Sequence, residues 1–302
     1  MGKLKVFWYY EPNFGDAIAP YLIRKLSGKE VVYTPSAHRI SLGREWRRFK
    51  VAPHEYDWHR ISWPETRRDV IMSVGSILEN SRPNYHVWGT GLMNANGVCK
   101  GGHIHAVRGR LTAERLVKLG FPQCDVVGDP ALLLPVVYNQ PYTDVQGSLH
   151  IPHSTNKLGI VPHIIEYESC KREYADEHVI SLHTCDVERV VDKICSCGLI
   201  LSSSLHGIIV AHAYGIPALW VKARLDVGGG DFKYRDYLSS VGKDTDFITY
   251  EELKVMLKFD RDALWNRAIQ LLPNREVIKG LQEHLLSVCP FPVLEKWKGS
   301  LL

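Results

Sequence analysis

The strongest constraint on the fold is an alternation between short apolar runs and longer helical patterns. The apolar runs are rich in β-branched and aromatic residues and are predicted strands, at 6–10, 31–33, 70–74, 86–88, 104–107, 125–127, 158–161, 179–182, 199–201 and 217–221. Helical patterns occupy 17–26, 112–119, 187–194 and 205–214. Strands that alternate with helices predict an α/β fold with mainly parallel sheets.

The alternation is interrupted at 137–154, where turn-forming residues show little periodicity and indicate a linker. We therefore predict two α/β domains, at 1–140 and 150–275. A C-terminal helical tail at 276–302 is expected to pack back on the first domain. Ligands of such folds bind at the carboxyl ends of strands, so the cleft between the domains is the expected site.

The charge balance argues against a nucleic-acid binder. The 302 residues include 37 Lys+Arg and 33 Asp+Glu, and a net charge of +4 suits at most a local basic pocket. Seven cysteines, an odd number, argue against a disulfide framework. The first residues lack a secretory h-region, and no apolar run reaches the ~18 residues that span a bilayer. We expect a cytoplasmic protein, whose oligomeric state the sequence does not indicate.

The strongest local indication of a site is a predicted strand, a serine-rich turn and a helix that meet at 199–207. A helix N-terminus has unpaired N–H groups and partial positive charge, so Ser204 and Leu205 stand where an anion binds readily. His206 falls in the first helical turn, where an imidazole with an ordinary pKa of about 6.5 can give and accept a proton. A packed or capping histidine on a buried helix is the alternative.

Two other strand–helix junctions bring polar groups to the same predicted cleft. Arg108 follows a predicted strand, and its guanidinium suits a carboxylate or phosphate; a surface ion pair is the alternative. Arg110 is expected at the surface. In the first junction Asn13 and Asp16 offer short polar groups at a helix start, and Gly15 permits close backbone approach. An ordinary strand–helix turn explains that junction equally well.

The remaining candidates follow strands or a glycine-rich loop. Gly75 and Ser76 form a turn, although the chain has neither a complete dinucleotide fingerprint nor a P-loop. His163 ends the first strand of the second domain and either faces the cleft or is a satisfied loop histidine. Lys233 and Arg235 follow three consecutive glycines, in a loop that is either a cationic lid or simply flexible.

The segment 43–69 is atypical because it combines seven basic residues with five aromatic ones. A surface excursion whose aromatic rings pack on the domain is one interpretation. A patch that stacks on sugars or contacts a membrane surface is the other, since amphipathic aromatic and basic groups suit both.

An ordered set of short motifs resembles the polysaccharide pyruvyl transferase family. The motifs are NFGD at 13–16, SVGSIL at 73–78, VWGTG at 87–91, VRGRLT at 107–112, GDPA at 128–131, LGIVPH at 158–163, SSSLHG at 202–207 and HAYGIP at 212–217. They keep their order over about 6–240.

The resemblance implies a GT-B-like fold, with two Rossmann-like domains that face a cleft. It implies that the first domain takes the acceptor and the second the donor. Pyruvate would pass from phosphoenolpyruvate to a sugar of an exopolysaccharide, capsule or cell-wall glycan, forming a ketal and releasing phosphate. The implied reaction uses no metal and no cofactor beyond this co-substrate.

The resemblance also assigns residues. The family's catalytic histidine corresponds to His206, its donor-binding arginine to Arg108, and a backbone donor contact to Leu205. Family members often have an arginine where this chain has Ser204. The candidate replacement cations are Lys222, Lys233 and Arg235, unless the serines suffice.

Two alternatives remain at this point. A glycosyltransferase of the same architecture would use a nucleotide sugar, for which Glu166 and Glu168 are available. A binding module for polysaccharide assembly would use the aromatic segment at 43–69. A lipid-linked oligosaccharide acceptor with peripheral membrane contact is compatible with the basic aromatic segment.

Overall fold

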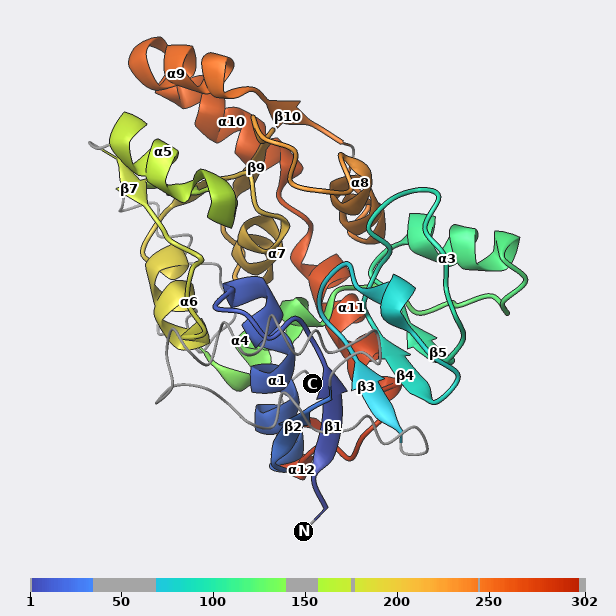
Figure 1. Ribbon diagram of the computed structural model, residues 1–302. Helices are drawn as coiled ribbons and strands as arrows, with labels where there is room; N and C mark the ends of the chain where they lie inside the picture. Colours follow the sequence, from blue (N-terminus) through green and yellow to red (C-terminus); the bar gives the residue numbers. More distant parts are fainter. Residues whose placement is uncertain (1, 35–68, 140–156, 175–176, 244, 299–302) are drawn as a thin grey trace, which may run out of the picture.

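The computed structural model describes residues 2–34, 69–139, 157–174, 177–243 and 245–298. The strands in these residues form two five-stranded sheets, in the orders β2-β1-β3-β4-β5 and β10-β9-β8-β6-β7, and every pairing is parallel. The first sheet contains β1 (Leu4–Phe7), β2 (Val31–Tyr33), β3 (Val70–Met72), β4 (Tyr85–Trp88) and β5 (His103–Ala106). The second contains β6 (Leu158–Val161), β7 (His178–Val179), β8 (Leu199–Ser202), β9 (Ala218–Val221) and β10 (Phe247–Ile248). The predicted α/β fold with parallel sheets is confirmed (Figure 1).

Helices connect and cover the two sheets. They are α1 (Phe14–Ser27), α3 (Arg110–Lys118), α4 (Leu134–Val137), α5 (Tyr167–Glu173), α6 (Val187–Cys195), α7 (Leu205–Ala213), α8 (Phe232–Ser240), α9 (Tyr250–Phe259), α10 (Arg261–Leu271), α11 (Arg275–Ser287) and α12 (Glu295–Lys298). Every residue of β3, β6, β8 and β9 is buried. Strands covered on both faces are continuously apolar, which is why these runs were recognisable in the sequence.

One of the hydrophobic clusters in the described residues joins the two halves of the chain. Phe14 and Ile18 of α1 and Leu132 of the 3-10 helix η3 (Pro130–Leu133) belong to the same buried cluster as Val190 of α6 and Ile208 of α7. Because α7 is packed from all sides, its sequence is apolar around the whole helix instead of on one stripe. This shared core holds the start of α1 close to the start of α7.

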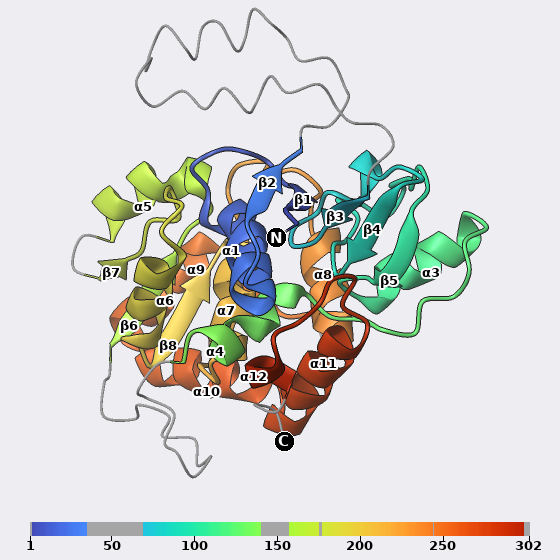
Figure 2. The ribbon, with the colours of Figure 1, turned by 90° about the horizontal axis from the view of Figure 1, so that it is seen from below.

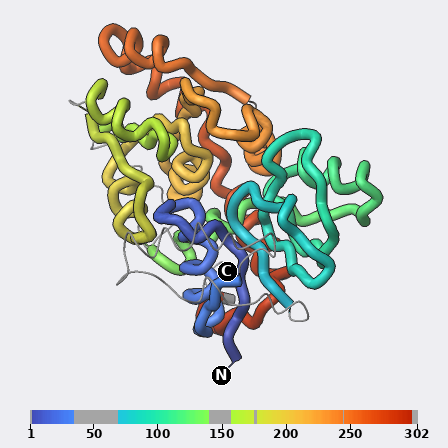
Figure 3. Tube along the Cα trace, in the orientation of Figure 1, coloured from blue at the N-terminus to red at the C-terminus, as the bar shows by residue number. Residues whose placement is uncertain are grey.

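The C-terminal segment returns to the first half of the chain. The Trp88 indole donates a hydrogen bond to the carbonyl of Leu285 in α11, at 2.9 Å, and the Trp297 indole donates to the carbonyl of Lys25, also at 2.9 Å. Phe291 packs edge-on against Trp88. Figure 2 shows α11 and α12 beside the first half, and in Figure 3 the red C-terminal tube runs close to the blue N-terminal tube.

Several predicted elements differ from the observed ones. The predicted strand at 125–127 is wrong: Val127 makes one isolated bridge, to Val107. The predicted first strand at 6–10 begins earlier and ends at Phe7, so the aromatic residues after Phe7 lie beyond the strand. Most of the predicted linker, and all of the atypical segment except Asp69, lie outside the described residues.

No helix in the described ranges is both long and apolar enough to cross a membrane. This agrees with the absence of a long apolar run in the sequence.

Candidate functional site

A cavity of about 190 Å³ lies between residues of the two halves. Its walls come from the loops that follow β1, β3 and β6, and from the starts of α1, α7 and α8. Sequence candidates that line it are Asn13, Gly15, Asp16, Gly75, Ser76, His163, Ser204, Leu205, His206 and Lys233. These residues meet because parallel strands direct the following loops to the same edge of a sheet.

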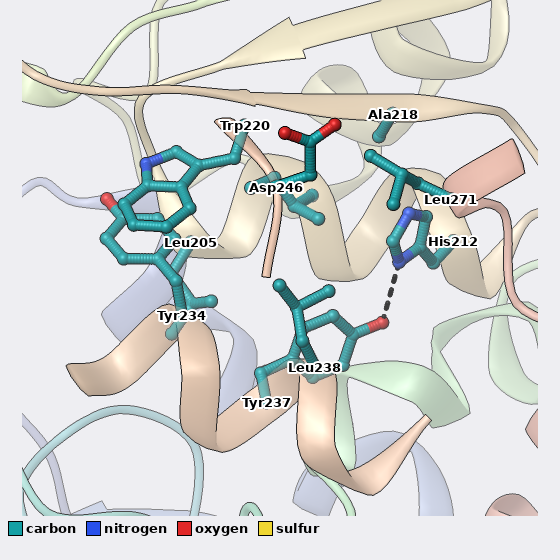
Figure 4. Close-up of a pocket in the computed structure, with 10 residues that line it drawn as sticks. Leu205, His212, Ala218, Trp220, Tyr234, Tyr237, Leu238, Asp246 and Leu271 are labelled. Carbon is teal, nitrogen blue, oxygen red and sulfur yellow. Dashed lines mark hydrogen bonds between the residues drawn. The ribbon is translucent and has the colours of Figure 1, made fainter. Parts of the chain in front are cut away.

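A second cavity, beneath α7, is much smaller. Its volume of about 10 Å³ holds about one water molecule, and its lining is mainly apolar. Figure 4 shows His212 and Tyr237 in this lining, with His212 Nδ1 3.0 Å from the Tyr237 hydroxyl. The larger cavity is therefore the candidate site.

Gly15 brings the start of α1 against the ring of His206. Asn13 caps α1 in an extended conformation, with φ at −140°, and its Oδ1 accepts a hydrogen bond from the Gly15 N–H at 3.0 Å. A Cβ atom on Gly15 would stand 2.3 Å from His206 Nδ1. The close approach of the His206 ring thus requires glycine at position 15.

His206 is held in the first turn of α7 as a neutral imidazole. Burial lowers its pKa to about 3, and the positive charges of Arg108 and Lys233 lower it further in the same direction. Its Nε2 atom is buried and has no hydrogen-bond partner in the described part of the chain. A bound anion would offset the two cations and raise this pKa, because it favours the charged imidazolium.

Lys233 supplies a cation at the cavity wall. It lies in the first turn of α8, and its ammonium group makes one long hydrogen bond of 3.4 Å, to the carbonyl of Val227. Burial lowers its pKa to about 8, with Arg108 acting in the same direction, so the charged form still predominates at neutral pH. The ammonium group also lies over the Tyr234 ring, 5.4 Å from its centroid. Neither contact is a strong hydrogen bond, so the ammonium group retains capacity to bind an anionic ligand.

Arg108 does not line the cavity, contrary to the prediction that it points into the crevice. Its guanidinium is fully buried and donates to Asp236 Oδ2 at 3.0 Å, to Ser76 Oγ at 2.5 Å and to the carbonyl of Leu92 at 2.8 Å. A buried charge is stable only when it is paired, and Asp236 provides the opposite charge. Arg108 therefore influences the cavity indirectly. It donates a hydrogen bond to Ser76, which lines the cavity, and its charge lowers the pKa of His206.

The other candidate replacement cations lie elsewhere. Arg235 is exposed and stands 4.0 Å from Asp231, while Lys222 forms an ion pair with the same carboxylate at 3.2 Å. Neither lines the cavity. Arg110 is exposed, as predicted.

His163 and Asp16 add two more titratable groups. The Nδ1 atom of His163 is buried without a partner in the described residues, and burial lowers the pKa of this imidazole, with Lys233 acting in the same direction. Asp16 behaves in the opposite way: burial, and then the charge of Glu11, raise its pKa to about 7. The cavity thus holds a carboxyl group that titrates near neutral pH.

Glu166 organises the loops around the site. One of its oxygens accepts from the N–H groups of Arg224 and Leu225, at 2.7 and 3.3 Å, and the other accepts from the Ser203 hydroxyl at 2.9 Å. The Ser203 oxygen in turn accepts from the N–H of His163 at 2.8 Å. This buried carboxylate ties three loops together, and sequence reasoning assigned it no such role.

Sequence reasoning also missed apolar and aromatic parts of the lining. Tyr9 lines the cavity with 46% of its surface exposed, and its hydroxyl accepts a hydrogen bond from the Asn80 amide at 3.2 Å. Its place directly after β1 was a usable signal, since residues after the carboxyl end of a parallel strand face the ligand site. Ile77 and Met93 also line the cavity, without a recognisable pattern in the sequence.

The part of the chain that the structure describes contains no cluster of side chains that would form a metal site. No three His, Cys, Asp or Glu side chains come together there in a way that would hold a metal ion.

Most of the candidate site lies in a segment that matches a known protein family. The family model described as polysaccharide pyruvyl transferase matches residues 13–222. These residues begin at the cap of α1 and end just after β9, so they include His206 and exclude Lys233.

One viral relative is similar over part of its length. An uncharacterised protein, L143, from Acanthamoeba polyphaga mimivirus is 34% identical over 186 residues, which cover 57% of this chain and 60% of that protein. The chain therefore matches about three fifths of the relative's length.

Proposed function

The chain belongs to the polysaccharide pyruvyl transferase family, and we propose that it moves a pyruvyl group from phosphoenolpyruvate to two hydroxyls of one sugar in a glycan. The product is a cyclic ketal, and inorganic phosphate is released. One observation carries this proposal: the partly buried imidazole of His206 lines a cavity beside the cation of Lys233, and its Nε2 atom has no hydrogen-bond partner in the described residues.

The donor is a small anion with two or three negative charges, and the second half of the chain offers groups that suit it. Lys233 provides a cation, and the first N–H groups of α7, at Leu205 and His206, provide the positive end of a helix dipole. The charge of Arg108, which donates a hydrogen bond to Ser76 in the cavity wall, adds positive electrostatic potential at the cavity. Each charge-assisted hydrogen bond is worth roughly 1.5–3 kcal/mol.

The reaction needs protons to move in both directions. One sugar hydroxyl bonds to C2 of the enol while C3 gains a proton and becomes a methyl group. A second hydroxyl then bonds to C2 while the bond from C2 to the phosphate oxygen breaks. The two hydroxyls lose one proton each, and C3 and the departing phosphate gain one each.

His206 suits the delivery of the proton to C3. Its lowered pKa keeps it neutral without a bound anion, and donor binding raises this pKa because the negative charges favour the imidazolium. The charged ring then gives its proton to C3 and becomes a base. An imidazole carries out both steps near neutral pH.

In this proposal, residues of the first half of the chain bind the acceptor sugar. Tyr9 presents a half-exposed ring at the cavity wall, and aromatic faces stack readily on sugar rings. Asn13 and Asp16 line the same wall and offer hydrogen-bonding groups for hydroxyls. We propose on this basis a GT-B-like arrangement, with acceptor and donor bound by opposite halves of the chain.

The test is direct turnover. Purified protein is incubated with phosphoenolpyruvate and a panel of free and lipid-linked oligosaccharides, and both released phosphate and the mass of the glycan product are measured. We expect phosphate release only with an accepted glycan, together with a ketal on that glycan. Phosphate release without any sugar product would contradict the proposal and indicate a phosphatase.

The variant His206→Gln sharpens this test, because glutamine keeps hydrogen-bonding capacity and cannot shuttle a proton. Its turnover should fall by about 10²–10⁴. A variant that retains nearly full turnover would exclude His206 from the proton transfer.

A nucleotide-sugar glycosyltransferase is not favoured by any observation. Glu166 would have been available to a nucleotide, but both of its oxygens accept hydrogen bonds from within the protein. Glu168 is exposed and does not line the cavity.

A further inference from the structure

Ketal formation by the proposed reaction needs two proton carriers, and His206 is one of them. While one group gives a proton to C3, another must take a proton from the hydroxyl that attacks C2. After this half-reaction the first group is deprotonated and the second protonated. The second half-reaction then restores both, since one hydroxyl loses a proton and phosphate gains one.

We propose that Asp16 is the second proton carrier, which takes the proton from the acceptor hydroxyl that attacks C2 and later returns a proton to the departing phosphate. This inference rests on the proposed function and names the residue that complements His206 in it.

Position is the first support for Asp16. It lines the cavity from the first turn of α1, on the wall assigned to the acceptor. Its neighbour Gly15 is in contact with the imidazole ring of His206. The two groups therefore belong to adjoining helix starts, one from each half of the chain.

The unused hydrogen-bonding capacity of Asp16 is the second support. Within the described ranges its carboxyl group makes no hydrogen bond or ion pair. Three buried carboxylates are engaged elsewhere: Asp129 caps η3 through Oδ1, Asp236 pairs with Arg108, and Glu166 holds three loops. Asp16 alone among these four lines the cavity and has its oxygens available for a ligand.

The electrostatic surroundings suit a base that works at neutral pH. Burial and the charge of Glu11 raise the pKa of Asp16 to about 7, which is near the optimum for proton transfer at neutral pH. The other titratable groups that line the cavity are Tyr9 after β1, His163 after β6, His206 on α7 and Lys233 on α8. Lys233 is the cation among them.

The substitution Asp16→Asn tests the proposal because it removes the proton-accepting function and keeps the shape. We expect kcat to fall by about 10²–10⁴ while the affinity for phosphoenolpyruvate, measured by the ligand-induced shift in melting temperature, stays close to that of the wild type. The wild-type kcat should rise with pH through the pKa of Asp16, and this rising limb should be lost in the variant.

Chemical rescue separates a proton carrier from a structural residue. In Asp16→Ala, added formate should restore part of the turnover, because a small carboxylate can occupy the space and accept the proton. A residue that served only to stabilise the start of α1 would give no rescue. Glu11→Gln is the matched control, since it removes the neighbouring charge and should shift the rising limb of kcat to lower pH with little change in the maximal rate.

The outcomes distinguish this inference from the proposed function. Wild-type turnover together with an unchanged kcat and pH profile in Asp16→Asn would overturn the role of Asp16 and leave the function standing. A wild type that consumes no phosphoenolpyruvate with any acceptor would overturn the function, and this inference with it.

Discussion

The backbone of Gly15 lies directly against the imidazole of His206, at a spacing that leaves no room for a side chain. A methyl group on residue 15 would stand 2.3 Å from Nδ1 and 2.9 Å from Cε1 of the ring. Residues 191 positions apart in the sequence thus form one wall of the cavity, and the orientation of His206 depends on a residue from the other half of the chain.

Gly15→Ala should therefore disturb the site more than the fold. Gly15 has no positive φ, so the clash with His206 is the main strain, and overpacking of this kind costs about 1–3 kcal/mol. We expect a turnover at least 10-fold lower together with a modestly lower melting temperature. Gly280→Ala is the matched control, since no atom lies within 4 Å of an added Cβ there. Full activity in Gly15→Ala would show that the ring position is unimportant.

Lys233→Met should weaken donor binding. Loss of one charge-assisted hydrogen bond of about 1.5–3 kcal/mol corresponds to a KM for phosphoenolpyruvate that is roughly 10- to 150-fold higher. Steady-state kinetics with varied donor measures this. Arg235→Met, on the same helix but away from the cavity, should leave the KM unchanged. Equal effects of both substitutions would indicate long-range electrostatics instead of contact.

Asp236→Asn should destabilise the protein, because it leaves the buried guanidinium of Arg108 uncompensated. Asp236 also accepts hydrogen bonds from the N–H and hydroxyl of Thr112, at 2.8 and 2.7 Å. Breaking a buried ion pair costs about 3–5 kcal/mol, measurable by urea unfolding. An unfolding free energy close to that of the wild type would mean that this ion pair is dispensable for stability.

Asp16→Asn should stabilise the fold above neutral pH even as it removes turnover. The folded pKa of Asp16, about 7, lies above its ordinary value of 3.8, so the contribution of Asp16 to stability is complete below 3.8 and is lost as the pH rises through 7. Relative to the wild type, the variant should gain about 1 kcal/mol or more at pH 8 and nothing at pH 3.5. Thermal unfolding at both pH values checks the sign.

Tyr9→Ala should impair use of the acceptor. The exposed ring stacks on a sugar in the proposed complex, and removing it should raise the KM for the glycan by about 2- to 13-fold, which corresponds to aromatic contacts of about 0.5–1.5 kcal/mol. The KM for phosphoenolpyruvate should not change. Tyr9→Phe keeps the ring and should behave like the wild type.

The sequence predicted most strands and helices because buried runs are easily recognised. The observed bounds of β2 and β6 are those predicted, and α7 differs by a single residue at its end. The failure at 125–127 has a simple cause: the run of three residues has the composition of a strand, but it forms only one isolated bridge, between Val127 and Val107. Composition indicates the tendency of a segment to form a strand. Whether it pairs in a sheet depends on which strand lies next to it in the folded protein.

The candidate residues were found for the same reason, since motifs at the ends of parallel strands meet at one edge of a sheet. The sequence alone therefore determined which helix starts and loops carry polar groups, and that His206 is one of these polar groups. Tertiary packing decided the rest. It paired Arg108 with Asp236 and with Ser76, away from the cavity, and it brought Lys233 to the cavity wall but not Arg235 or Lys222. It also brought Gly15 into contact with His206. Burial, charge pairing and close contact arise between residues far apart in the chain, so no local pattern contains them.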